Sequence, residues 1–458
     1  MLEHSVKIEK LFVEVNTSSK EKADRINSDI EVFVNERLLP ELEEILKKND
    51  SPTVYYRIQK LTLTGNISNW DNSELLLSGI PDELSRQIAA LQDSVAEKEQ
   101  MPKQSEEEML GEMFLYYLKS GFLPWFGSML HLQQFISGTW KDTVQYKSFI
   151  NEFTKTLAFN IFSARRFLFT ASPEMQKYVF ENILPLSPDL MRDIKQKSNP
   201  DLITAMIYAV ACIHWMKQNS VNLNLKDIEP MVSDILTTFP QFREKQELKR
   251  IQNLISQITA SHLEIPSKVE SVFAQVSWVK PEKKNLASND IVNDEIWVEN
   301  AGLILMHPFL PGFFRKTGIL TKDNGIKEPK LNLAVQVLHY LATGKETAHE
   351  AEMVLERVLC GIPLLYPVKT EEPLSDDIKR AAVHMLEALI GHWPALKQTS
   401  PDGLRQLFFC REGKMKEEEN HYSLIVERKA QDILLDRLNW NISFFSLPWL
   451  DKMIHIVW

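Results

Sequence analysis

Two histidine-containing segments have spacings close to those of known metal sites. The segment HEAEM (349–353) begins like the helix of a zinc protease, which needs a second histidine where this chain has Met353. His384 and His392 are eight residues apart and would lie within about 80° of each other on one helix. Gly391 predicts, however, that the helix ends before His392. We therefore predict no metal site.

Nucleotide binding and nucleophilic catalysis require residue types that the sequence does not combine. The segment ATGKE (342–346) has the Gly-Lys of a phosphate-binding loop, but it lacks the upstream glycine and the Ser or Thr after the lysine. Cys410 would be a nucleophile only beside a base that lowers its pKa, and the sequence shows none. We predict no catalytic residue, no cofactor site and no enzymatic activity.

His307 lies within a strongly apolar run, NAGLILMHPFLPGFFRKTGIL (300–320). A catalytic or metal-binding imidazole is one interpretation, and a structural histidine at a helix-to-loop corner is the other. Pro308 favours an extended conformation at His307, which predicts that a helix begun near Ala301 ends there. One ring nitrogen would then bond to the backbone groups freed at the corner, and we favour this structural interpretation.

The densest group of polar residues is TSPDGLRQLFFCREG (399–413). Helix architecture explains much of it, since Ser400 suits a helix N-cap and Gly413 suits a helix stop. Arg405 and Arg411 are left as buried ion-pair partners or as contacts to another protein.

Composition and charge are those of a folded protein that does not bind nucleic acid. The chain has 458 residues, of which 44% are apolar and 25% charged, so we expect two or three domains. Its net charge of −10 repels phosphate backbones unless a basic face compensates. The basic cluster REKQELKR (243–250) alternates with glutamate and indicates an ordinary solvated helix surface.

Targeting and membrane signals are not expected in this sequence. Charged residues interrupt the first ten positions, which excludes the apolar core of an export signal. The longest apolar run, TAMIYAVACIHWM (204–216), is shorter than the roughly 20 residues that a membrane-spanning helix needs. Cys212, Cys360 and Cys410 lie far apart among apolar neighbours, as buried thiols do in a reducing cytosol. We expect a cytoplasmic protein.

The N-terminal region predicts a β-α-β unit with further helix over residues 1–95. We expect a strand at 5–15, a helix that Pro40 interrupts, and a second strand at 53–65 that pairs with the first. The polar segment 95–108 is expected to be an exposed linker.

The middle of the chain, 105–276, is expected to be a helical domain. No glycine occurs between Gly138 and Gly302, and glycine is the residue that most often ends helices and permits tight turns. Loops containing proline, serine and asparagine are therefore expected to join the helices. The segment 277–290 is a second expected linker.

A third domain is expected at 290–458. Helical spacing is clear in three segments that each end at a glycine, namely 331–344, 348–361 and 375–391. Alternating or β-branched patterns predict a small terminal sheet with strands at 421–427, 441–447 and 453–458. The predicted fold class is mainly α, multi-helical, with small α+β elements at the N- and C-terminal ends.

Several separated motifs follow one another in order along the chain. Towards the C-terminus they are NAGLILMHPFL (300–310), YLATG (340–344), VLCG (358–361), HW followed by leucine (392–396), TSPDGLRQLFFCREG (399–413), VERKAQDILLD (426–436) and LPWL…VW (447–458). Towards the N-terminus they are a strand opening on His4, IQKLTL (58–63) and YYLKSGFLPWF (116–126). Together they resemble the tape measure family of contractile injection systems, the phage-tail-like extracellular syringes of bacteria. The middle, about 145–270, is similar only in being helical.

This resemblance implies a non-enzymatic assembly protein that acts as a tape measure or a tube-initiation factor. The implied partners are the inner tube, the baseplate hub or spike, and tube-cap proteins, without nucleic acid, membrane or cofactor. Assembly would take place in the bacterial cytoplasm. The candidates for partner contact or a structural role are Trp125, His307, Trp393, Arg405, Arg411, Trp449 and Trp458.

Two other functions are open at this point. One is an α-helical cytosolic scaffold or chaperone that binds effector cargo, and the other is a hydrolase that uses His307 or His392. For a ruler, 458 helical residues would span at most about 690 Å. A compact chain of this length has a radius of gyration of about 23 Å. Helix caps, glycine stops and alternating strands favour compact domains in the free protein.

Overall fold

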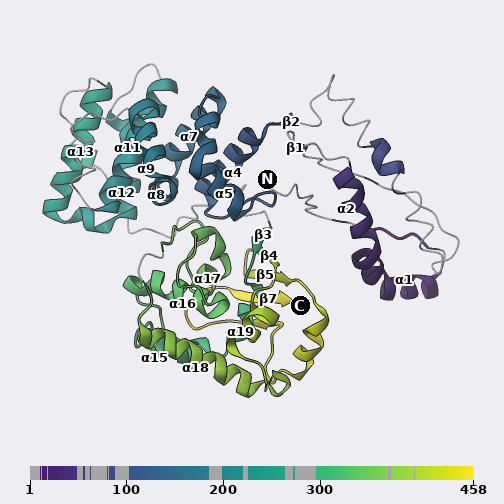
Figure 1. The fold of residues 1–458 in the computed structure, drawn as a ribbon. Coiled ribbons are helices and arrows are strands. Elements are labelled where there is room, and N and C mark those ends of the chain that lie inside the picture. Colours follow the sequence, from purple (N-terminus) through teal and green to yellow (C-terminus); the bar gives the residue numbers. More distant parts are fainter. Residues whose placement is uncertain are drawn as a thin grey trace. The chain divides into compact units, whose positions relative to one another are not determined.

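The computed structural model of the protein consists of two compact units, Met1–Gly111 and Glu112–Trp458. It describes residues 11, 13–17, 19–48, 55–56, 62, 80, 82–87, 103–184, 199–219, 225–263, 272–273, 295–369, 373–396 and 398–458. Helices predominate and one five-stranded sheet lies near the C-terminus, which confirms the predicted fold class (Figure 1). The expected division into domains at 1–95, 105–276 and 290–458 stays a prediction.

The described part of the smaller unit is dominated by one long helical segment. It comprises α1 (Lys20–Phe33), the π-helical turn η1 (Val34–Leu38) and α2 (Leu39–Lys48). The prediction that Pro40 interrupts this helix is wrong. The backbone N–H of Leu39 donates to the carbonyl of Val34, so the helix widens immediately before the proline that has no N–H to donate.

The smaller unit has a strand within the expected segment 53–65, but this strand pairs differently from the prediction. Strand β1 (Tyr55–Tyr56) pairs antiparallel with β2 (Lys103–Gln104), which lies in the predicted linker. Of the strand expected at 5–15, residues 11 and 13–15 are not in a strand, and the others lie outside the described residues. The linker prediction also fails at Ser105, because its hydroxyl and the Glu108 carboxylate cap each other's backbone N–H groups and start a helix.

The first part of the larger unit is a helical body, defined here as the described residues from 112 to 263. Its helices are α4 (Glu106–Ser120, of which it contains the portion from Glu112), α5 (Met129–Gln134), α6 (Trp140–Thr143), α7 (Lys147–Phe159), α8 (Ile161–Thr170), α9 (Pro173–Tyr178), α11 (Pro200–Asn219), α12 (Glu229–Thr238) and α13 (Lys245–Leu263). Helix α11 packs against α7, α8 and α13 and is buried continuously from Thr204 to Ile213. This burial explains why its sequence is the longest apolar run.

The second part of the larger unit is a C-terminal body, defined here as the described residues from 295 to 458. Its sheet has the order β3-β4-β5-β7-β6. The strands are β3 (Ile296–Val298), β4 (Gly413–Glu417), β5 (His421–Val426), β6 (Phe444–Phe445) and β7 (Met453–Val457). All pairs are antiparallel except β5 and β7, which run parallel with Leu424 opposite Ile456. The three predicted terminal strands are confirmed, whereas β3 and β4 were not expected.

Helices pack around this sheet in the C-terminal body (Figure 1). They are η7 (Ala301–Met306), α15 (Leu310–Lys316), α16 (Leu331–Thr343), η9 (Glu350–Glu352), α17 (Val354–Leu359), α18 (Asp376–His392), α19 (Pro401–Leu404), η11 (Arg405–Phe409) and η12 (Ala430–Arg437). Gly344 and Gly361 have φ of 77° and 68°, so the predicted glycine stops at 344 and 361 are confirmed.

Two other glycines do not end helices as predicted. Gly391 lies inside α18, which continues to His392, so His384 and His392 do share one helix. Gly413 begins β4, where it pairs with Val298 of β3 and Val426 of β5. A Cβ atom there would lie 2.6 Å from the Cβ of Ala301. Glycine is needed at Gly413 for close strand packing, a requirement that sequence spacing does not distinguish from a helix stop.

The C-terminal body has a hydrophobic core of its own. Residues from the sheet, η7 and helices α15–α18 form one buried cluster. Among the described residues, Phe122 is the one buried side chain of the helical body that belongs to this cluster. The two bodies therefore bury most of their apolar surface separately.

Candidate functional site

His307 lies at the end of η7 and contacts both the backbone and the sheet. Its Nδ1 atom lies 3.0 Å from the carbonyl oxygen of Ile304, so Nδ1 carries the proton and donates it. The ring stacks on Phe445 of β6 at 4.2 Å between centroids and 11° between planes. Its backbone is helical, with φ −50° and ψ −39°, so the extended conformation expected before Pro308 is wrong. The residue before a proline is biased away from the helical region without being excluded from it.

We expect replacement of His307 with alanine to destabilise the C-terminal body. Burial lowers the pKa of His307, which keeps the ring neutral near pH 7 and able to donate through Nδ1. The substitution removes this hydrogen bond and the stacking on Phe445, so it should lower the free energy of unfolding by about 1–3 kcal/mol. Chemical denaturation measures the loss. Unchanged stability together with loss of assembled particles would instead identify His307 as a partner contact.

Arg405 holds the C-terminal end of α16. Its side chain is buried and donates to the carbonyl oxygens of Leu341 at 3.1 Å and Tyr340 at 3.2 Å. These carbonyls belong to the last helical turn, where a cation is favoured. Arg405 also donates to Asp402 at 2.6 Å, but the Asp402 side chain is 80% exposed. Arg405 and Leu341 are 64 positions apart, so two separate motifs meet at this arginine.

Arg411 and Trp458 converge on one carboxylate. Arg411 is fully buried and donates to the carbonyl oxygen of Leu407, and it pairs with Asp432 at 2.9 Å. The indole N–H of Trp458 donates to the other oxygen of Asp432 at 2.9 Å. The backbone N–H of Lys429 donates to that same oxygen at 2.8 Å. Asp432, which lies in η12, therefore binds Arg411, which follows η11, and Trp458 at the end of the sequence.

The other tryptophan candidates are also packed against the protein. Trp393 is fully buried and donates to the carbonyl oxygen of Leu434 at 3.0 Å. Trp449 is half-buried and donates to the carbonyl oxygen of Leu359 at 2.8 Å. Trp125 in the helical body is half-buried and packs edge-on against the adjacent Phe126.

A close backbone contact joins the motif at 300–310 to the motif at 399–413. A Cβ atom at Gly302 would lie 1.7 Å from the carbonyl oxygen of Phe408. Next to it, the buried Asn300 donates to Glu356 at 3.0 Å. The ring of His339 lies 3.2 Å from the same carboxylate oxygen. The motif at 300–310 thus contacts residues from two later parts of the chain, Glu356 and Phe408.

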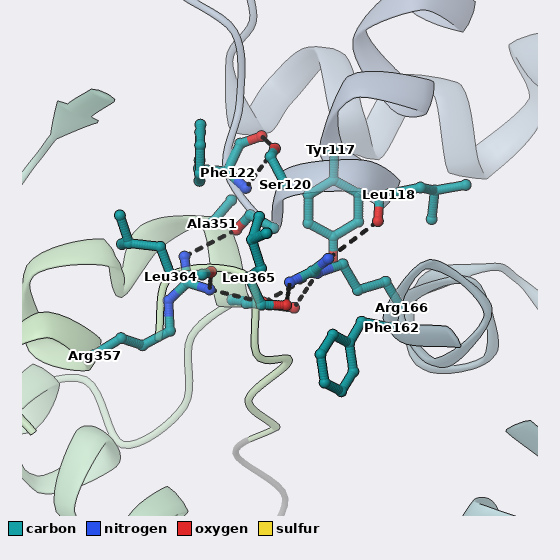
Figure 2. A network of polar contacts seen from close by, with 12 residues as sticks. Tyr117, Leu118, Ser120, Phe122, Phe162, Arg166, Ala351, Arg357, Leu364 and Leu365 are labelled. Atoms are coloured by element: carbon teal, nitrogen blue, oxygen red, sulfur yellow. Dashed lines mark hydrogen bonds and ion pairs between the residues drawn. The ribbon is translucent and has the colours of Figure 1, made fainter. Parts of the chain in front are cut away.

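A second buried network, formed by Arg166, Glu350 and Arg357, was not found from the sequence. We call these three residues the arginine clasp. Figure 2 shows Arg166 of α8 and Arg357 of α17 approaching from opposite sides. Arg166 Nε lies 3.2 Å from Glu350 Oε1, and Arg357 Nη1 lies 2.8 Å from the same oxygen. Both arginines are fully buried.

Each arginine of the clasp also donates hydrogen bonds to backbone carbonyl oxygens. Arg166 donates to Leu118 at 3.1 Å and to Lys119 at 3.2 Å, at the end of α4. Arg357 donates to Leu364 at 2.8 Å and to Gly121 at 3.2 Å. The only local signals were an arginine within an apolar helical run and the first glutamate of HEAEM.

Burial governs the ionisation of groups near the clasp. Burial raises the pKa of Glu350, and the two guanidinium groups act in the opposite direction by lowering it. Burial also raises the pKa of Tyr117. His349 caps η9 through Nδ1, and burial lowers its pKa to about 4, so it is neutral near pH 7.

The cysteine thiols do not have the lowered pKa of a nucleophile. Cys212 and Cys360 are buried as expected, but Cys410 is exposed, so the expectation that all three are buried is wrong. The π-helical turn η11 places Cys410 just past its end, on the surface, with its Sγ atom 3.5 Å from the carbonyl oxygen of Ala342. Desolvation nevertheless raises the pKa of the Cys410 thiol.

A metal cluster is not apparent in the part of the chain that the structure describes. No three His, Cys, Asp or Glu side chains in that part are arranged to hold a metal ion. An open depression of about 450 Å³ lies on the helical body, lined by Trp140, Lys141, Val144, Glu174, Lys177, Tyr178 and Glu181. Within the described residues, no helix combines the length and apolar character needed to cross a membrane.

Comparison with known proteins identifies the family. The family model described as contractile injection system tape measure protein matches residues 3–458. The chain belongs to this family. No curated protein and no solved structure matches it. The resemblance inferred from the separated motifs is confirmed, and a tape measure protein is a structural component of an injection particle.

In this tape measure family member, the residues selected from the motifs are held by contacts within the chain. Arg411 and Trp458 meet at Asp432, and Gly302 meets the backbone of Phe408, whereas Trp125 lies apart from them in the helical body. Whether any of the selected residues also contacts a partner stays a prediction.

Proposed function

We propose that this tape measure family member acts in its compact form as a tube-initiation factor of the injection particle. The proposed partners are the inner tube, the baseplate hub or spike and tube-cap proteins, and the proposed place of assembly is the bacterial cytoplasm. The proposal assigns the chain no catalytic activity.

The observation that supports a compact working form is the burial of charged side chains across the larger unit. Arg166, Arg357 and Arg411 are each fully buried and hydrogen-bonded. An extended ruler would have to break these contacts and expose both hydrophobic cores, for which the particle would have to supply a large free energy. A compact factor uses the fold as it stands.

We expect deletion of Glu229–Leu263, which contains α12 and α13, to reduce the number of tubes but not their length. The segment lies within the region that resembles the family only in being helical, and it does not contribute to the arginine clasp. In an extended helical ruler, losing about 35 residues would shorten each tube by roughly 50 Å at 1.5 Å per residue. Electron microscopy of particles from the deletion strain measures both quantities.

A length-matched replacement of Glu229–Leu263 by an unrelated helical segment is the control. A ruler would recover its original tube length with this replacement. Proportional shortening in the deletion and recovery in the replacement would contradict the initiation proposal. Normal numbers of normal tubes that lack effector cargo would instead favour a cargo scaffold or chaperone.

A further inference from the structure

The two bodies of the larger unit meet through a junction centred on the arginine clasp. Each body has its own helices, and the C-terminal body has its own core. Around the clasp, Phe162 packs edge-on against Tyr366 at 5.3 Å, and Tyr117 lies 5.0 Å from the ring of His349. At its rim the ammonium group of Lys369 lies 4.6 Å from the ring of Phe169. The junction thus has charged groups at its centre and a few aromatic contacts around them.

The clasp draws its charged groups from both bodies and carries one more positive than negative charge. Arg166 comes from the helical body, whereas Glu350 and Arg357 come from the C-terminal body. Two guanidinium groups share one carboxylate, and the remaining positive charge faces the last carbonyls of α4 and the carbonyls of Gly121 and Leu364. The C-terminal end of a helix favours a cation.

Such an arrangement holds the junction in one geometry and is sensitive to the loss of any member. Removing one partner of a buried ion pair leaves an uncompensated charge, which is strongly destabilising. Separation of the bodies would instead let water solvate the remaining charges, and among the described residues Phe122 is the one buried side chain of the helical body that would leave the C-terminal core. The clasp therefore lies on the boundary between the two bodies.

We propose that the arginine clasp is a latch whose release separates the helical body from the C-terminal body while both stay folded. The latch gives the larger unit a second, longer state in which its two folded parts are joined only by the connecting chain. This inference concerns the chain by itself and does not depend on the proposed role in tube initiation.

Hydrogen–deuterium exchange of the full-length Glu350→Gln variant tests the latch. The variant leaves both guanidinium groups without their carboxylate. We expect the junction segments around Gly121 and Tyr366 to exchange about a hundredfold faster than in the unmodified protein. The cores of α11 and α16 should keep their protection.

Two comparison variants separate release from general destabilisation. Replacing Arg166, Glu350 and Arg357 together by methionine removes every charge of the clasp at similar volume, and should keep the junction protected. Lys369→Ala removes a contact at the rim of the same junction and should also leave it closed.

Either of two results would overturn the latch. Faster exchange of Glu350→Gln throughout α11 and α16 would make the clasp a requirement for folding. Unchanged exchange at the junction would show that the clasp does not hold the bodies together.

Discussion

Replacement of Gly302 with alanine should unfold or severely destabilise the C-terminal body. An added Cβ atom would lie 1.7 Å from the carbonyl oxygen and 2.7 Å from the carbonyl carbon of Phe408, where two backbone segments meet. Backbone atoms in a packed core cannot move aside as a flexible side chain does, so we expect a loss of about 3 kcal/mol or more in the free energy of unfolding. Chemical denaturation and the yield of soluble protein measure the effect.

Gly312 provides a matched control in the same apolar run. It lies on the exposed side of α15, and an added Cβ atom there would meet nothing within 4 Å. Alanine is favoured over glycine in a helix, so Gly312→Ala should be neutral or stabilising by up to about 1 kcal/mol. Equal stability of the two variants would contradict the close contact at Gly302.

Replacement of Arg411 with methionine should be the second most damaging change. Methionine keeps part of the apolar stem but removes the two donors to Leu407 and the ion pair with Asp432. The Asp432 side chain is only 12% exposed, so its charge is left poorly solvated. Breaking a buried pair in this way costs about 3–5 kcal/mol, which a shift in the denaturation midpoint measures.

Arg405→Met is the matched comparison, since Arg405 also bonds to carbonyls and to an aspartate. Its partner Asp402 has a side chain that is 80% exposed, so water solvates the carboxylate after the arginine is removed. The main loss is then the hydrogen bonds to Tyr340 and Leu341, and we expect about 1–2 kcal/mol. A larger effect at Arg405 than at Arg411 would show that burial of the acidic partner does not decide the outcome.

Features that depend on residues close together in the sequence were predicted correctly. Ser400 was predicted to cap a helix, and its hydroxyl accepts from the N–H of Gly403 at 3.1 Å. Gly344 was predicted to stop a helix, and it has the positive φ of a helix end. The alternating pattern at 421–427 predicted β5. Each of these features depends on residues only a few positions apart, so the sequence displays the whole interaction.

Predictions from neighbouring residues were wrong at two glycines. Gly413 has the spacing of a helix stop, but pairing with Val298 and Val426 places it in a strand. Gly391 also suggested a stop, yet α18 continues through it to His392, and no packing contact accounts for this because an added Cβ atom there would meet nothing within 4 Å. The error at Gly413 was not visible from neighbouring residues, because glycine is compatible with several backbone states and packing selects among them.

By itself, the sequence determined that the protein is mainly helical with a small C-terminal sheet, and its ordered motifs predicted the tape measure family. Only the tertiary structure decided which charged residues are buried together. Arg166 and Glu350 are separated by 184 positions, and nothing near either residue indicates the other. Helix and strand periodicity record which side of an element is buried. They do not record which element covers it, because that choice depends on the packing of the whole unit.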